Sequence, residues 1–162
     1  MNRRAQIGAL ACALLLPAAG AAPDERRSGF DFMSPQTQAM QRDDTLNPGM
    51  LWVAGGEELW NRKAGEADRS CAACHGEAKS SMRGVAARYP VYDSAQRRPI
   101  DLVQRINRCR NDHQQARPLA AESADLLGLE SYVAHQSRGM PIAPEGDARL
   151  LPFRERGRKL FE

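Results

Sequence analysis

The sequence has 162 residues, which suits one modest domain with some additional segments. Hydrophobic residues make up 42% of it but aromatic residues only 6%, so the core is poor unless a large flat cofactor supplies apolar mass. The formal net charge of +3 gives no indication of a nucleic-acid-binding protein.

The first 22 residues have the three parts of a secretory signal peptide. Arg3 and Arg4 form the charged start, residues 5–16 form an apolar run, and small residues at 18–22 offer cleavage sites. The apolar run is too short to cross a membrane, and no later segment is long enough. We therefore predict a cleavable signal peptide over residues 1–22 and no membrane-spanning segment.

Residues 23–50 are polar and predict an extended N-terminal arm, with a disordered leader as an equally good interpretation. A first helix is expected over about 51–63. Its apolar residues are Trp52, Leu59 and Trp60. Gly55 and Gly56 lower the helix propensity of its early turns, but residues this small let another helix approach closely.

The sequence CAACH at residues 71–75 has the C-x-x-C-H spacing of c-type haem attachment. Each thiol can form a thioether with a porphyrin vinyl group, and the adjacent His75 imidazole then lies under the iron as an axial ligand. Without the signal peptide three cysteines remain, namely Cys71, Cys74 and Cys109. If Cys71 and Cys74 hold haem c covalently, Cys109 is a lone thiol in an oxidising compartment, which requires an explanation.

Residues 77–92 predict a loop with one short helical turn, followed by a clearer helix over about 99–113 that Pro99 opens. Helical spacing places four of its residues on one stripe, and three arginines flank that stripe. The stripe is Leu102, Ile106, Cys109 and His113, and the arginines are Arg105, Arg108 and Arg110.

The next helix is expected over about 121–137, where Gly139 and Pro141 end it. No segment alternates between apolar and polar residues as a strand does. We therefore predict an all-α fold, with a cytochrome c-like haem domain of three to four short helices over residues 51–148.

Five residues are candidates for the sixth position on the iron: Cys109, Met140, His113, His135 and Met82. In ordinary cytochromes c the distal ligand precedes the last helix, which favours Cys109 over Met140, and Met82 is too close in sequence to His75. Arginines beside Cys109 favour its thiolate. His113 on the same stripe is the next candidate, and a methionine ligand stays open. A thiolate ligand stabilises ferric iron and lowers the reduction potential.

Five blocks of sequence carry a specific resemblance. They are Leu46-Asn47-Pro48-Gly49, Ser70-Cys71-Ala72-Ala73-Cys74-His75-Gly76, Arg83-Gly84-Val85-Ala86-Ala87-Arg88-Tyr89-Pro90, Gln104-Arg105-Ile106-Asn107-Arg108-Cys109-Arg110 and His135-Gln136-Ser137-Arg138-Gly139-Met140-Pro141. From about Asn47 onward the chain resembles SoxA, the A subunit of the sulfur-oxidising cytochrome complex. The resemblance implies that Cys71 and Cys74 attach haem c and that His75 and Cys109 are the axial iron ligands.

The resemblance also implies a function. SoxA pairs with a small cytochrome, SoxX, in the periplasm. The complex couples thiosulfate to a cysteine of the carrier protein SoxYZ, and electrons pass to a c-type cytochrome. This is an L-cysteine S-thiosulfotransferase activity.

Members of this family normally have two cytochrome c domains, and the catalytic cysteine ligates the second haem. This sequence matches only the first domain, so no catalytic residue is assigned in it. Residues 56–61 are echoed by residues 157–162, which predicts a linker and the first helix of a second, truncated domain over 149–162.

Two other functions stay open. One is a simple monohaem electron-transfer cytochrome c with Met140 or a histidine as distal ligand. The other is a zinc-binding structural module that uses Cys71, Cys74, His75 and Cys109.

Overall fold

The computed structural model describes residues 27–144 and 146–162. The predicted signal peptide lies outside these residues. The chain divides into two compact units, Met1–Gln38 and Ala39–Glu162. None of the helices in the described part of the chain combines the length and hydrophobicity that a bilayer crossing requires.

The described part of the predicted arm contains two helical segments, so it is not simply extended. A 3-10 turn, η1, covers Gly29–Phe32, and the Ser28 hydroxyl caps it by accepting from the Phe30 amide. Helix α1 covers Pro35–Arg42 and begins with a proline, whose fixed φ favours a first helical position. A local cap and a proline start therefore favour these turns.

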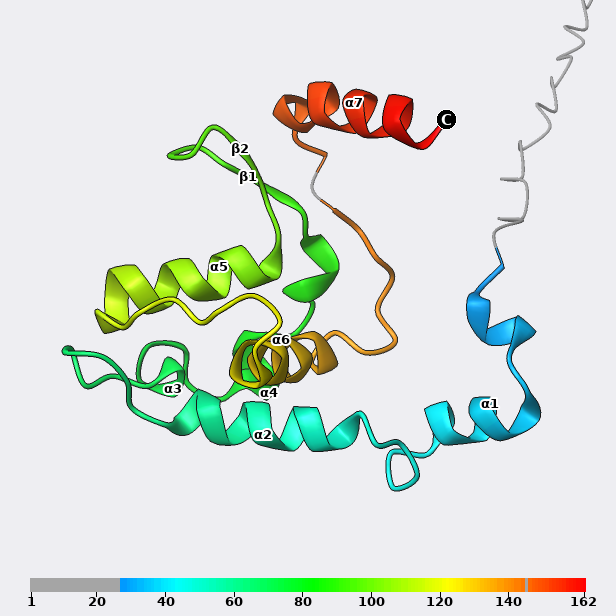
Figure 1. Cartoon of the computed structure of the whole chain (residues 1–162), viewed down its shortest axis with the longest axis horizontal. Helices are drawn as coiled ribbons and strands as arrows, with labels where there is room; N and C mark the ends of the chain where they lie inside the picture. Colours follow the sequence, from blue (N-terminus) through cyan, green and yellow to red (C-terminus); the bar gives the residue numbers. More distant parts are fainter. Residues whose placement is uncertain (1–26, 145) are drawn as a thin grey trace, which may run out of the picture. The chain divides into compact units, whose positions relative to one another are not determined.

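Helices α2 (Met50–Asn61) and α6 (Ala124–His135) cross each other and form the centre of the second unit. Where Figure 1 shows α2 lengthwise, α6 is seen end-on beside it. Both helices were predicted; α2 begins one residue earlier and ends two residues earlier than expected, and α6 is shorter than expected at both ends. Their buried residues make up much of the core. These are Trp60, Leu126, Leu129, Tyr132 and Val133.

Helix α5 covers Leu102–Cys109 and begins three residues later than predicted. Asp101 caps it, because its carboxylate accepts from the Gln104 amide and the Gln104 side chain accepts in turn from the Asp101 amide. The prediction that Pro99 opens this helix is wrong.

Pro99 belongs instead to a short antiparallel hairpin of β1 (Val91–Asp93) and β2 (Arg98–Ile100). The Asp93 carboxylate shapes the turn by accepting from the Ala95 and Gln96 amides, both at 2.9 Å. Strands of three residues are too short to show an alternating pattern, so they were not predicted.

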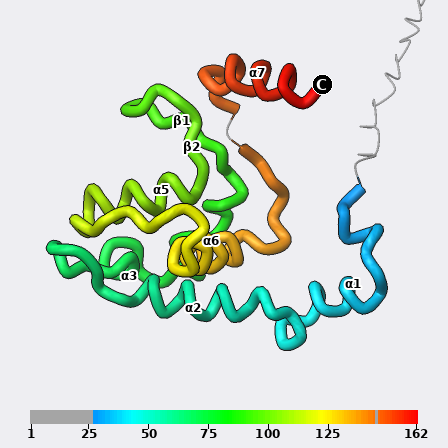
Figure 2. The backbone as a smooth tube through the Cα atoms, viewed as in Figure 1, coloured from blue at the N-terminus to red at the C-terminus, as the bar shows by residue number. Residues whose placement is uncertain are grey.

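The remaining elements are short helical segments and one longer helix, α7, and Figure 2 traces them in sequence colours. They are α3 (Cys71–His75), α4 (Ala78–Ser81), η2 (Ala86–Arg88), the π-helix η3 (Arg110–Gln114), η4 (Ala148–Leu150) and α7 (Leu151–Phe161). Helices dominate the described chain, as predicted. A linker and a helix were predicted within 149–162, and α7 lies in this range; its assignment to a second domain stays a prediction.

Candidate haem-binding site

Helix α3 presents the three residues of the C-x-x-C-H segment on little more than one helical turn. The Ser70 hydroxyl starts the helix by accepting from the Ala73 amide at 3.0 Å. Gly76 ends it at a φ of 68°, directly after His75. Cys71 and Cys74 are both free thiols, the first half-buried and the second exposed. Because they are three residues apart on a helix, they lie on the same side of it.

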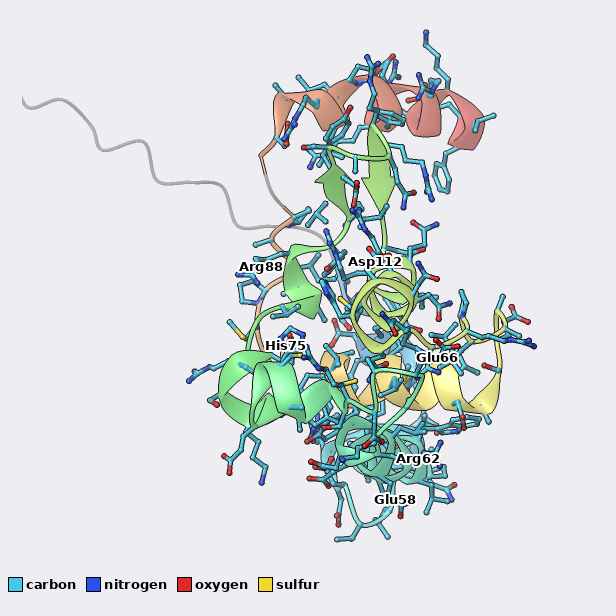
Figure 3. The ribbon with its side chains drawn as sticks, turned by 90° about the vertical axis from the view of Figure 1, so that its left-hand side faces the viewer. Glu58, Arg62, Glu66, His75, Arg88 and Asp112 are labelled. Carbon is cyan, nitrogen blue, oxygen red and sulfur yellow. The ribbon has the colours of Figure 1, made fainter. Side chains whose placement is uncertain are left out.

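Trp60 of α2 holds the end of α3 in place. Its ring centroid lies 5.7 Å from that of His75, and its indole Nε1 donates to the Gly76 carbonyl at 3.0 Å. Figure 3 shows His75 in the space between α3 and α5, beside yellow sulfur atoms. The imidazole therefore has a fixed neighbour on one side and open space on the other.

That space is a cavity of about 240 Å³, and three of the four predicted site residues line it. Cys71 and His75 reach it from α3, while Cys109 reaches it from the end of α5. Most of the other lining residues are apolar. They include Trp60, Met82, Val85, Leu102, Ile106, Leu129 and Val133.

The structure separates the five candidates for the sixth ligand. Cys109, His113 and Met82 all line the cavity. Met140 does not line it; 41% of its surface is exposed, and it packs against Gly84. The His135 imidazole likewise lies elsewhere, with Nε2 4.0 Å from Asp44.

Burial governs the protonation of Cys109. It raises the pKa of the thiol above its usual value, whereas Arg105 and Arg108 lower it by a smaller amount. The predicted effect of the arginines is therefore present, but burial outweighs it. A thiolate at this position needs a further positive charge close by, such as a metal ion.

The residues present fit a haem. A porphyrin has an apolar ring, which matches the cavity lining, and two carboxylates, which need cationic partners. The Nε atom of Arg110, which lines the cavity, is buried and has no hydrogen-bond partner. A carboxylate at that point would satisfy it.

A zinc site fits less well. Among the residues that the structure describes, no three His, Cys, Asp or Glu side chains are grouped to hold a metal ion. Cys71, Cys74, His75 and Cys109 all belong to this part of the chain, so their arrangement does not support the zinc-binding alternative.

Sequence reasoning missed two residues at this site. Trp60 was identified only as an apolar helix residue, and its contact with His75 follows from how α2 packs. Gln114 lines the cavity and is 6% exposed, yet nothing in its sequence surroundings marked it.

Comparison with known proteins gives matches to a family of cytochrome c domains. The model of the SoxA/TsdA cytochrome c domain family matches residues 55–142. A protein from Pseudaminobacter salicylatoxidans, named L-cysteine S-thiosulfotransferase subunit SoxA, is 37% identical over 139 residues, which cover 85% of this chain and 49% of that protein. The protein of the same name from Rhodovulum sulfidophilum is 33% identical over 138 residues, covering 85% and 48%.

A solved structure also matches. One chain of the crystal structure of SoxXA from P. pantotrophus superposes with a TM-score of 0.76 at 30% sequence identity. The match covers 82% of this chain and 50% of that chain. The chain thus spans about half the length of the relatives that it matches.

Proposed function

The chain belongs to the SoxA/TsdA cytochrome c domain family, and from this membership we propose that it is a haem c-binding part of a thiosulfate-oxidising complex. Its predicted all-α, cytochrome c-like fold is confirmed by the helical structure and its match to a solved relative. The haem supplies one-electron redox chemistry when bound. The rest of the function depends on how the residues of this chain hold it.

In this proposal Cys71 and Cys74 form the two thioethers, and His75 and Cys109 are the axial ligands. One observation carries the assignment: His75 and Cys109 come from different helices, α3 and α5, and line the same apolar cavity. Two side chains that reach one cavity from separate helices could both hold the iron of a haem bound there. The thiolate form of Cys109 then depends on the iron, because burial alone favours the thiol.

The relatives are named L-cysteine S-thiosulfotransferase subunits, and the matching structure is a SoxXA complex. We infer from them a periplasmic role in which this chain pairs with a SoxX-like cytochrome. Thiosulfate, a SoxYZ-like carrier protein and a c-type cytochrome acceptor complete the reaction. The residues of this chain bind the haem and form its surroundings, and we assign no catalytic residue among them.

A second candidate is a simple electron-transfer cytochrome with His75 and His113 as ligands. It is favoured by one observation, that His113 lines the same cavity as Cys109. Both candidates predict covalent haem and differ in the atom that completes the iron coordination.

The ligand set can be tested on the chain produced with a c-type cytochrome maturation system. Haem should stay attached in denaturing electrophoresis and be lost when Cys71 and Cys74 are both replaced by alanine. The ferric absorption and electron paramagnetic resonance spectra should show a thiolate ligand that Cys109→Ala abolishes and His113→Ala preserves. The opposite pattern would favour the electron-transfer cytochrome.

The role in the complex needs a separate measurement. The haem-loaded chain is mixed with the small cytochrome of a thiosulfate-oxidising bacterium, and complex formation is followed by size-exclusion chromatography. We expect a one-to-one complex, whereas an unrelated small cytochrome c should elute separately. No association with either cytochrome would contradict the proposed partnership.

A further inference from the structure

The loop that leads from α2 to α3 lies directly against the π-helix that follows Cys109. The amides of Glu66 and Ala67 donate to the carbonyls of Gln115 and Gln114, at 3.3 and 3.2 Å. Figure 2 shows this loop and the end of α5 beside each other. The two segments are far apart in sequence, yet their backbones are hydrogen-bonded as neighbours.

Gly65 makes this contact possible. Its φ is 70°, and a Cβ atom placed on it would lie 2.0 Å from the Gln114 carbonyl oxygen and 2.7 Å from the Ala116 nitrogen. Both of these are backbone atoms, which cannot turn aside as the end of a side chain can. No residue other than glycine therefore allows the two backbones to lie this close together.

Gln114 adds a side-chain connection across the same contact. Its Nε2 donates to the Arg69 carbonyl at 2.8 Å and lies 4.0 Å from the Cys71 sulfur. The side chain is almost fully buried and lines the cavity. It thus connects the π-helix to the turn that leads into α3.

These contacts join the two segments that carry the proposed haem ligands. Arg69 is two residues before Cys71, and Gln114 is five residues after Cys109. Because only these short segments separate the contact from the proposed ligands, we expect a shift at the contact to move Cys109 relative to α3.

We propose that Gly65 and Gln114 are positioning residues that set how far the Cys109 sulfur lies from the haem held by α3. This inference rests on the axial role of Cys109 given under the proposed function. Neither residue touches the iron, and each acts through the contact between the loop and the π-helix.

The first test compares Gly65→Ala with Gly139→Ala in the haem-loaded chain. Gly139 also has a positive φ, 75°, but a Cβ there would meet no atom within 4 Å. The Gly139 variant carries the same type of backbone strain without the clash. We expect Gly65→Ala to keep its covalent haem and to lose part or all of the thiolate signature, with a rise in reduction potential. Gly139→Ala should keep the wild-type spectrum and potential.

The second test keeps the inference open to contradiction if Gly65→Ala does not fold. Gln114→Met preserves side-chain length and burial but removes the donor to Arg69. Its control is Gln136→Met, since Gln136 also donates to a backbone carbonyl, that of Tyr132 at 2.8 Å, and does not line the cavity. We expect the thiolate signature to weaken in Gln114→Met alone.

The outcomes distinguish the positioning role of Gly65 and Gln114 from the axial role of Cys109. If Cys109→Ala leaves the wild-type spectrum unchanged, the axial role itself is wrong. If Cys109→Ala changes the spectrum but folded Gly65→Ala and Gln114→Met retain the wild-type spectrum and potential, the positioning role alone is overturned. A wild-type result for Gln114→Met also overturns it when Gly65→Ala fails to fold.

Discussion

Gly56 in α2 and Gly128 in α6 bring the backbones of the two helices into contact. A Cβ atom on Gly56 would lie 2.0 Å from the Gly128 carbonyl oxygen, whereas a Cβ on the adjacent Gly55 would meet nothing within 4 Å. The crossing therefore has one position at which no side chain fits. The crossing also helps to position α3, because the Trp60 indole on α2 donates to the carbonyl of Gly76, the residue that follows α3.

Gly56→Ala should destabilise the fold strongly. Added atoms in a packed core typically cost about 1–3 kcal/mol, and the upper end is expected here because the clash is with backbone. The measurement is the free energy of unfolding of the haem-loaded chain in urea. Gly55→Ala is the matched control, and it should stabilise α2 by about 0.5–1 kcal/mol, since alanine is the better helix former. Equal effects at the two positions would contradict the close crossing.

The sequence predicted this crossing only in part. It showed that small residues at Gly55 and Gly56 permit a close approach, and this is confirmed for Gly56 alone. Successive residues point to different sides of a helix, so the side that meets α6 depends on packing. That α6 would supply Gly128 as the facing residue was not predictable from local sequence.

Trp60→Phe should lower stability by about 1–3 kcal/mol, because it leaves the Gly76 carbonyl without its donor and removes buried ring volume beside His75. Trp60 is only 4% exposed. Trp52→Phe on the same helix is the control; Trp52 is 44% exposed, and its replacement should change stability by less than about 0.5 kcal/mol. Thermal unfolding of both variants with haem bound measures the two losses of stability. Similar losses would show that the indole bond contributes nothing specific.

The start of α5 was mispredicted for a reason that the sequence itself contains. Pro99 is a common first helical residue, but Asp101 and Gln104 form a capping box two positions later, and that stronger start determines the helix. The π-helix after Cys109 is different. Its geometry accompanies backbone contacts with the loop around Gly65, which are tertiary and leave no local trace. The sequence thus indicated Cys109 as a candidate ligand but not the residues that contact the segment after it.

The Asn107 side chain should hold in place the segment between the π-helix and α6. Its side chain donates to the Leu119 carbonyl at 2.9 Å and accepts from the Leu119 amide at 2.8 Å. Asn107→Ala breaks both bonds and should cost about 1–3 kcal/mol. Asn111→Ala is the control, since that side chain is exposed and donates to the neighbouring Asp112. Faster amide hydrogen exchange at Leu119 in the first variant only would confirm the role.

Asp93 should make the stability of the fold depend on pH in the acid range. The Gln96 amide and then the Arg108 guanidinium hold the pKa of this buried carboxyl below its ordinary value of 3.8, although burial acts in the opposite direction. The folded state therefore binds the proton more weakly than the unfolded chain does. The resulting stabilisation is complete above the ordinary pKa and is lost as the pH falls through the lower pKa of the folded state.

Asp93→Asn should consequently be less stable than the wild type at about pH 7, and the difference should shrink as the pH falls to about 3. Urea unfolding of both haem-loaded proteins across this range measures the difference directly. Asp68→Asn is the control, because Asp68 pairs with Lys63 while 72% of its side chain is exposed. Its effect should stay within about 1 kcal/mol throughout. A difference between wild type and Asp93→Asn that is constant with pH would show that the native fold does not favour the charged form of Asp93.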